Sequence, residues 1–283
     1  MKHAYLIIAH NEFEVLQLLV SALDDERNDI YVHIDKKVRT LPKLHTSKSK
    51  LCILDRRIDV RWGHYSQIET EILLFETALH NGPYEHYHLI SGTHLPLKNK
   101  DQIHSFFNDL QGKNIFSNLK TTDRHYQEIL KVHRINFFLR GYSSPIKLKA
   151  KTSQLLWKAF IAVQRWLNIT INDDTTYYWA NNWCSLTNDA AAYLISKKDD
   201  IRCRYRWSFC GDEFVVPTEL MRSSFADTLV SSYELLYGAI GRSNASVLTI
   251  ANYESMVESG CIFGRKFSKS EQELLIKVKE LFR

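Results

Sequence analysis

The sequence predicts an α/β protein with a central, mainly parallel sheet flanked by helices. Short continuous apolar runs, at residues 4–9, 30–34 and 87–90, alternate with segments of helical periodicity at 13–23 and 66–80. Strands that are apolar along their whole length are typical of a sheet covered on both faces. Their alternation with helices indicates parallel βαβ units.

The rest of the chain extends this pattern. Asp101 is expected to cap a helix that reaches Leu110, and residues 223–259 show no regular pattern. The other expected elements are a strand at 51–54, a helix at 146–167, strand-like aromatic sequence at 175–187, and helices at 188–196, 214–221 and 270–283.

Composition favours a soluble globular protein. The 283 residues are 45% hydrophobic and 24% charged, and the net charge is +5. A charge this small does not indicate nucleic acid, and it fits an anionic substrate or an anionic membrane surface equally well. We expect a single domain, with a nucleotide-sugar-binding half at 1–118 and an acceptor-binding, catalytic half at 119–283.

Cysteine usage and hydropathy predict a cytoplasmic location. The five cysteines are scattered and contain no CxxC pair, so a disulfide framework or zinc site is not expected. The apolar run at the N-terminus is too short for a signal peptide, and no run reaches the ~18 residues of a membrane span.

Polar residues follow three of the expected strands. His10 and Asn11 follow the first strand, Asp35 the second, and Ser91 and Gly92 the strand at 87–90. In parallel sheets the ligand lies beyond the carboxyl ends of the strands. The sequence therefore predicts a binding pocket there.

Two charged pairs are candidates for chemistry. Asp212 and Glu213 lie where a glycine-containing loop enters a buried helix, which suits either an acidic helix start or a catalytic base. Arg265 and Lys266 follow Gly264, where they would place positive charge at the edge of a pocket or simply decorate the surface.

Standard metal and nucleotide motifs are not found. The sequence contains no Walker loop, GxGxxG, HExxH or GxSxG motif. A metal-dependent phosphohydrolase would need several of the histidines near strand ends, but their spacings match no standard ligand pattern. The candidate metal ligands are His10, His33, His64, His88 and His94, with Asp35. The acidic pairs 24–25 and 173–174 are better explained as turn or cap residues.

The middle of the chain is basic and aromatic. Residues 124–126 and 131–140, including Arg134, mix cations with aromatic rings. The segment 146–167 is a basic amphipathic helix, for which the preferred interpretation is packing on the core with a solvated outer face. The alternative is contact with an anionic membrane surface.

Seven blocks together resemble the core-2/I-branching family of glycosyltransferases, which also contains the peptide xylosyltransferases. They occur in the family's order along the whole chain. The blocks are residues 4–11, 30–37, 60–66 (Val-Arg-Trp-Gly-His-Tyr-Ser), 87–97, 183–187, 211–213 (Gly-Asp-Glu) and 263–267 (Phe-Gly-Arg-Lys-Phe).

The resemblance implies a GT-A-type, Rossmann-like nucleotide-sugar-binding fold and an inverting, metal-independent transfer. Glu213 matches the family's catalytic base, although Gly211 stands where the family usually has proline. Asp35 matches the acidic residue near the uridine, and Arg265 and Lys266 the basic pair near the diphosphate. The expected donor contacts also include His10, Asn11, Trp62, Gly63, Ser66, Ser91 and Gly92, and the expected acceptor contacts are Trp183, Asp212 and Arg134.

The expected donor is UDP-GlcNAc, with UDP-xylose as the alternative, and no metal or other cofactor is expected. The missing luminal disulfides and anchor suit a bacterial cytoplasmic relative. The expected acceptor is a glycan or lipid-linked oligosaccharide of a bacterial surface polysaccharide, with peripheral contact at the inner face of the membrane. A metal-dependent phosphohydrolase and a non-catalytic sugar-nucleotide-binding protein are less favoured alternatives.

Overall fold

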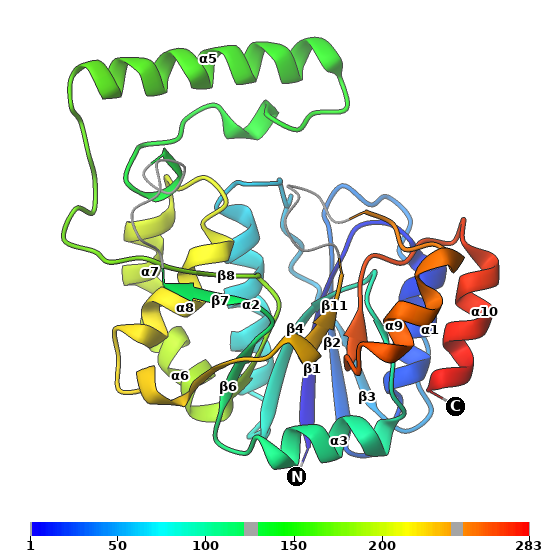
Figure 1. Ribbon diagram of the computed structural model, residues 1–283. Helices are drawn as coiled ribbons and strands as arrows, with labels where there is room; N and C mark the ends of the chain where they lie inside the picture. Colours follow the sequence, from blue (N-terminus) through cyan, green and yellow to red (C-terminus); the bar gives the residue numbers. More distant parts are fainter. Residues whose placement is uncertain (1, 122–129, 239–245, 283) are drawn as a thin grey trace.

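A seven-stranded mixed sheet forms the centre of the protein (Figure 1). The computed structural model describes residues 2–121, 130–238 and 246–282. The strand order is β10-β6-β9-β4-β1-β2-β3. The strands are β1 (His3–Ala9), β2 (Asn28–Ile34), β3 (Lys50–Ile53), β4 (His86–Ser91), β6 (Asn114–Phe116), β9 (Cys184–Thr187) and β10 (Leu229–Ser231).

The sheet is parallel where the predicted pocket should lie. Strands β4, β1, β2 and β3 run parallel, and only β9 is antiparallel to its neighbours β4 and β6. The predicted fold class, α/β with a mainly parallel sheet, is confirmed. Strands β9 and β10 lie in the second half of the sequence, so both halves build the same sheet.

Helices cover both faces of the sheet, which explains the continuous apolar strands. Tyr5 and Ile7 of β1 face a core formed with α1 (Phe13–Leu23), α3 (Lys100–Asp109) and α10 (Gln272–Leu281). Leu6 and Ile8 face the opposite core, formed with α2 (Ser66–Leu79), α6 (Asn188–Ser196) and α8 (Asp212–Met221). Because successive side chains of a strand point to opposite faces, a strand between two cores is apolar throughout.

Two local predictions need correction. The cap of α3 is Asn99 and not Asp101, because Asn99 and Gln102 form a reciprocal capping box and Asp101 lies in the first turn. Residues 223–259 were expected to be irregular, but they contain β10, β11 (Leu236–Tyr237) and α9 (Tyr253–Glu258). These elements are too short to show a recognisable period. Residues 239–245 of this stretch lie outside the described residues.

Two small sheets attach further segments to the body. Strands β5 (Leu95–Pro96), β12 (Phe263–Gly264) and β11 form one of them, with β12 in the middle. Strands β7 (Leu119–Thr121) and β8 (Tyr178–Ala180) form the other. Helix α7 (Lys198–Tyr205) precedes the loop that enters α8.

Helix α5 (Lys147–Trp166) lies apart from the sheet, across the top of the molecule in Figure 1. Only Ser153, Ile161 and Gln164 of this helix are buried. The interpretation of this segment as a core-packed helix is therefore wrong. No helix within the described ranges is both long enough and apolar enough to cross a membrane. Residues 124–126, grouped with the basic middle of the sequence, lie outside the described residues.

Candidate active site

A cleft of about 590 Å³ opens at the carboxyl ends of β1, β2 and β4. Most of the residues predicted from sequence contribute to its wall, including residues that are more than two hundred positions apart. They are His10, Asn11, Asp35, Trp62, Ser91, Gly92, Trp183, Asp212, Glu213, Arg265 and Lys266. The carboxylates of α8 and the cations that follow β12 therefore share one cavity.

Three predicted residues do not line the cleft. Gly63 has a φ of +69°, and a Cβ there would lie 2.4 Å from the Phe209 ring, so it permits close packing of two loops. Ser66 accepts a hydrogen bond from the backbone N–H of Arg61 at 2.9 Å. Arg134 is buried beneath α5, and its Nη1 lies 3.5 Å from the carbonyl oxygen of Gln164. The first two position cleft residues, and the placement of Arg134 does not support a direct acceptor contact.

Glu213 is held at the start of α8 by two donors. Its Oε2 accepts hydrogen bonds from Lys131 Nζ at 2.9 Å and from Trp179 Nε1 at 3.0 Å. Among the described residues no donor contacts Oε1, and the side chain remains about one-third exposed to the cleft. Burial opposes the charged form of Lys131, but the carboxylate of Glu213 more than compensates and raises the pKa of the lysine. The arrangement presents an oriented carboxylate with one free oxygen.

Two further carboxyl groups, those of Asp212 and Glu71, lie near Glu213. Burial, together with the charge of Glu213, raises the pKa of Asp212 to about 7. Glu71 of α2 is 2% exposed, and burial followed by the charge of Asp212 raises its pKa well above the usual range. Glu71 Oε1 accepts hydrogen bonds from Asn182 at 2.9 Å and Gln67 at 3.3 Å, both of which line the cleft. Closely spaced buried carboxyl groups cannot all ionise, so this cluster retains protons near neutral pH.

Gly211, where the family usually carries proline, is required by its neighbour Ser208. A Cβ at Gly211 would lie 2.0 Å from Ser208 Oγ, which in turn donates to the carbonyl oxygen of Tyr205 at 2.7 Å. The φ of Gly211 is −66°, which lies within the range of proline. The helix start is thus retained, and the serine side chain occupies the space that a larger residue would need.

Arg265 has no carboxylate partner within the part of the chain that the structure describes. Its guanidinium lies 5.0 Å from the centre of the Trp183 ring, and its Nε is buried with no hydrogen-bond partner among the described residues. Burial lowers the pKa of Arg265. The backbone is fixed from both sides, since Arg265 N donates to Tyr237 O at 2.9 Å and Phe267 N to Thr93 O at 3.0 Å. A half-buried cation with an unsatisfied donor is suited to bind an anion.

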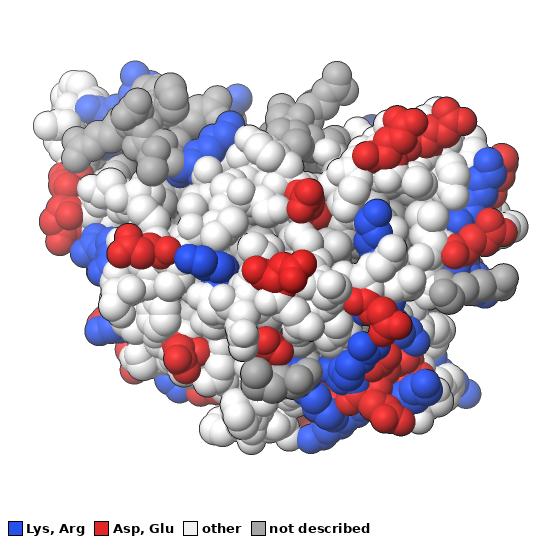
Figure 2. All heavy atoms as spheres, turned by 60° about the horizontal axis from the view of Figure 1, so that its bottom comes forward, with Lys and Arg blue, Asp and Glu red and all other residues white. Residues whose placement is uncertain are grey.

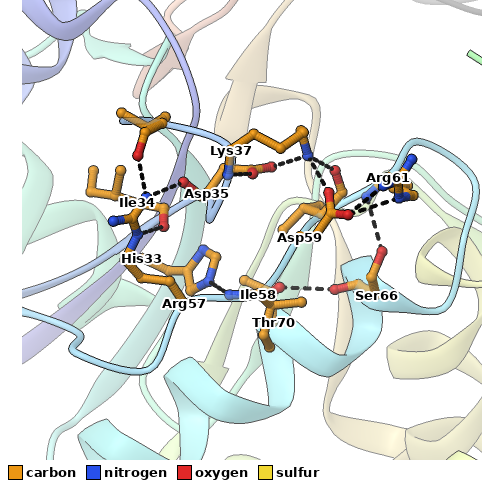
Figure 3. Close-up of polar contacts among 12 residues, drawn as sticks. His33, Ile34, Asp35, Lys37, Arg57, Ile58, Asp59, Arg61, Ser66 and Thr70 are labelled. Carbon is orange, nitrogen blue, oxygen red and sulfur yellow. Dashed lines mark hydrogen bonds and ion pairs between the residues drawn. The ribbon is translucent and has the colours of Figure 1, made fainter. Parts of the chain in front are cut away.

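Asp35 belongs to a chain of alternating charges beyond β2 (Figure 3). Its carboxylate accepts from the backbone N–H of Lys37 at 2.8 Å and from Lys37 Nζ at 2.7 Å. Lys37 Nζ also contacts Asp59 at 2.9 Å, and Asp59 pairs with Arg61. Arg57 ties this network to the end of β2 by donating to the carbonyl oxygens of Ile34 at 3.1 Å and Asp35 at 2.8 Å. The network fixes the wall at which Asp35 meets the cleft.

The loops after β1 and β4 form the floor of the cleft. A Cβ on Gly92 would lie 2.8 Å from Cβ of Ala9, so glycine is needed where these loops meet. Ser91 Oγ lies 2.8 Å from Nδ1 of the buried His94 and 3.0 Å from Thr93 Oγ1. Burial lowers the pKa of His10. The charge of Asp35 opposes this effect, and the charge of Lys266 adds to it. His10 is therefore neutral at pH 7.

An aromatic rim, formed by Trp62 with Tyr142 and Phe209, borders the cleft, and Trp62 itself lines it. The exposed ring of Trp62 stacks on Tyr142, with ring centres 6.0 Å apart, and meets Phe209 edge to face at 5.4 Å. Tyr142 lies in the segment that leads into α5. Sugar rings stack on surfaces of this kind, so the rim suits a glycan.

Sequence reasoning missed several residues of the site. Lys131 and Trp179 hold Glu213, Glu71 contacts two cleft amides, and Lys37 and Arg61 complete the network around Asp35. Lys37, two positions after Asp35, and Arg61, next to Trp62, carried a local signal. The other three come from α2, from β8 and from the segment after β7, so only tertiary contacts identify them.

The histidines proposed as metal ligands are dispersed. His33 Nε2 accepts from the backbone of Ile58 at 2.9 Å, and His88 is buried against His3 and Ser185. Across residues 2–121, 130–238 and 246–282 no group of three or more His, Cys, Asp and Glu side chains is arranged to hold a metal ion. The geometry therefore does not support the phosphohydrolase alternative.

Comparison with known proteins identifies a family. The family model described as "Branch: Core-2/I-Branching enzyme" matches residues 3–243 of the chain. No curated protein matches.

Two solved structures show weak similarity to the chain. Mouse xyloside xylosyltransferase 1, in its apo form, has 9% sequence identity and a TM-score of 0.40, covering 95% of this chain and 98% of that one. S. aureus TarS 1–349 has 14% identity and a TM-score of 0.30, covering 81% of this chain and 68% of that one. At these scores neither similarity supports an argument about function.

Proposed function

The chain belongs to the Core-2/I-Branching enzyme family and is a glycosyltransferase, and we propose that it transfers GlcNAc from UDP-GlcNAc, with inversion, to a hydroxyl group of a glycan acceptor. The observation that carries this proposal is the shared cleft, in which Glu213 and the Arg265–Lys266 pair line one cavity of about 590 Å³. This volume lies in the usual range for small-molecule sites.

Glu213 acts as the general base in this proposal. It takes the proton from the acceptor hydroxyl, whose oxygen forms a bond to the anomeric carbon. The bond from that carbon to the β-phosphate oxygen breaks on the opposite side, and its electron pair leaves with the nucleoside diphosphate. The free Oε1 of Glu213 is available for this proton, while Lys131 and Trp179 fix the other oxygen. A single base suffices, unlike the acid and base pair of a glycosidase.

Arg265 and Lys266 stabilise the leaving group. Negative charge grows on the diphosphate as the bond breaks, and fixed cations in a partly buried site stabilise it without solvent reorganisation. The guanidinium of Arg265 has no carboxylate partner among the described residues, so the diphosphate is free to pair with it. We propose that these cations take the part that a divalent ion plays in metal-dependent transferases.

We assign the remaining cleft residues to the donor or to the acceptor. Asp35, on the wall fixed by Lys37 and Arg57, faces the nucleoside of the donor, as the family resemblance implies. We assign the acceptor to the aromatic rim around Trp62 and the amides of Asn181 and Asn182, which line the same cleft as Glu213. We place the reaction in the cytoplasm, in keeping with five unpaired cysteines. We assign the product to a bacterial surface polysaccharide.

A panel of nucleotide sugars tests the donor. A ligand that binds only the folded protein raises its melting temperature. At a ligand concentration of about a hundred times the dissociation constant, the free energy of unfolding increases by about 2.7 kcal/mol. UDP-GlcNAc should give the largest shift, ahead of UDP-xylose and UDP alone. A larger shift with UDP-xylose would favour the xylosyltransferase alternative. Stabilisation without hydrolysis or transfer of any donor would favour a non-catalytic binding protein.

A further inference from the structure

The outer face of α5 is apolar and has no partner among the described residues. Leu148, Leu155 and Trp166 are 76%, 69% and 83% exposed, and Ala159 lies on the same face. These four residues are spaced at i, i+7, i+11 and i+18. At 3.6 residues per turn, this spacing places all of them on one side of the helix. Large apolar side chains repeated on one exposed face mark a surface that binds another phase or molecule.

Cations border this apolar face. Lys147, Lys151, Lys158 and Arg165 repeat at i, i+4, i+11 and i+18, so they line one edge of it, and each of them is exposed. The helix contains no Asp or Glu. A long basic side chain beside an apolar stripe can place its stem on hydrocarbon and its charge among anionic head groups.

The positive charge is concentrated in this segment. Residues 137–169 contain six Lys and Arg and no acidic residue, against a net charge of +5 for the whole chain, so the rest of the chain has a net charge of 5 − 6 = −1. Figure 2 brings forward the end of the molecule opposite α5, and acidic and basic side chains alternate there. Helix α5 thus offers a surface with cations and without Asp or Glu, and that charge complements an anionic membrane.

The same segment forms part of the cleft. Leu139, Arg140 and residues 143–145 line the cleft immediately before α5 begins. Arg140 is fixed there, because its carbonyl oxygen accepts from Arg61 Nη1 at 2.7 Å. Helix α5 also lies at the same end of the molecule as the carboxyl ends of the parallel strands (Figure 1), and the cleft opens at that end. A surface bound by α5 would therefore lie beside the cleft.

We propose that α5 lies in the head-group region of an anionic lipid bilayer, with Leu148, Leu155 and Trp166 inserted and the flanking cations among the head groups. This placement rests on the proposed function and extends it, because it identifies the acceptor class as a glycan carried on a membrane lipid. The acceptor sugar would then reach Glu213 from the membrane side, past the aromatic rim.

Vesicle sedimentation tests the proposal. Binding should be strong to vesicles of phosphatidylcholine with about 30% phosphatidylglycerol and weak to phosphatidylcholine alone, and it should decrease with added salt. The double variant Lys151→Glu/Lys158→Glu should bind at least about 25-fold more weakly, at about fivefold for each cation lost. The double variant Leu155→Ser/Trp166→Ser should also lose most of its binding.

Matched controls come from α10. Ile276 is 64% exposed and Lys279 is exposed, so Ile276→Ser and Lys279→Glu change equivalent residues on another surface and should bind like the wild type. The proposal is wrong if the wild type does not bind anionic vesicles, or if the α5 and α10 variants bind equally. It is also wrong if the wild type is a dimer that Leu155→Ser/Trp166→Ser dissociates, because a second copy would then cover this face.

The melting-temperature shift with UDP-GlcNAc separates this proposal from the proposed function. All of these variants should keep that shift, because none of the six substituted positions lines the cleft. Vesicle binding without any nucleotide-sugar shift would overturn the proposed function and the acceptor class while leaving the membrane surface in place. A melting-temperature shift with UDP-GlcNAc but without vesicle binding would support the proposed function and overturn the membrane surface.

Discussion

The ammonium group of Lys131 lies 2.9 Å from Oε2 of Glu213, although the two residues are 82 positions apart in the sequence. Lys131 follows the small β7 strand, and Glu213 begins α8. Trp179 of β8 completes the contact from a third segment, at 3.0 Å from the same oxygen. A carboxylate oriented by two donors, with its other oxygen open to a cleft, is the feature on which the predictions about catalysis depend.

Replacing Glu213 with Gln should abolish most of the transfer but preserve donor binding. The amide keeps the shape of the side chain and cannot accept a proton, and a general base typically contributes about 10²–10⁴-fold to the rate. Steady-state turnover with UDP-GlcNAc and an acceptor should fall by that factor, while the melting-temperature shift with UDP stays unchanged. Full activity in this variant would show that another group is the base.

Replacing Arg265 with Met should weaken donor binding by about 10–100-fold, the worth of a charge-assisted hydrogen bond at a partly buried site. Titration with UDP measures this loss directly. Lys269→Met is the matched control, because Lys269 lies four positions downstream, is exposed and pairs with Glu14 at 3.2 Å. Equal dissociation constants for Arg265→Met and the wild type would remove Arg265 from the donor site.

Transfer should proceed unchanged in EDTA. In the proposed mechanism the growing charge on the diphosphate is met by Arg265 and Lys266, so chelation removes nothing that the reaction needs. Initial rates of the purified protein with and without EDTA provide the measurement. A rate that falls in EDTA and recovers on addition of Mn²⁺ would show instead that a divalent ion takes part.

Acidification should destabilise the protein through four buried histidines. His3, His86, His88 and His104 contact one another beside Phe107, and burial lowers the pKa of His86 and of His104 to about 4. In the unfolded chain these rings regain a pKa of about 6.5. Unfolding therefore takes up protons as the pH falls from 6.5 towards 4, and stability that is present above pH 6.5 is lost over this range.

The His86→Leu variant isolates one of these groups. It should lose stability less steeply between pH 6.5 and 4, by up to about 1.4 kcal/mol per pH unit, because one fewer proton is taken up on unfolding. Urea unfolding at several pH values provides the slope. His45→Leu, at an exposed position, is the control and should follow the wild type. Identical slopes for His86→Leu and the wild type would place the acid sensitivity elsewhere.

The sequence can place a residue at the cleft where that placement follows from local order. His10, Asn11, Asp35 and Ser91 end buried strands or directly follow them, and parallel strands bring their carboxyl ends to one edge. Arg265 and Lys266 came from the resemblance alone, because β12, which precedes them, is only two residues long. No local pattern could show that such a short strand pairs with β5 and β11.

Two other features could not be obtained from sequence. The partners of Glu213 depend on the pairing of β7 with β8, and short strands give no periodic signal. The α5 segment was misassigned because an amphipathic pattern looks the same whether its apolar face meets a protein core or another surface. Only the position of the helix, away from the sheet, decides between these interpretations.

The pairing of β7 with β8 has an evolutionary consequence. Thr121 and Tyr178 are cross-strand partners, so the long stretch between them, α5 included, leaves and re-enters the body at neighbouring points. A segment anchored in this way can be lengthened, shortened or exchanged while the strands that end at the cleft keep their register. Relatives could therefore diversify what they glycosylate by replacing this one stretch, provided that each replacement still supplies a partner for the carboxylate of Glu213.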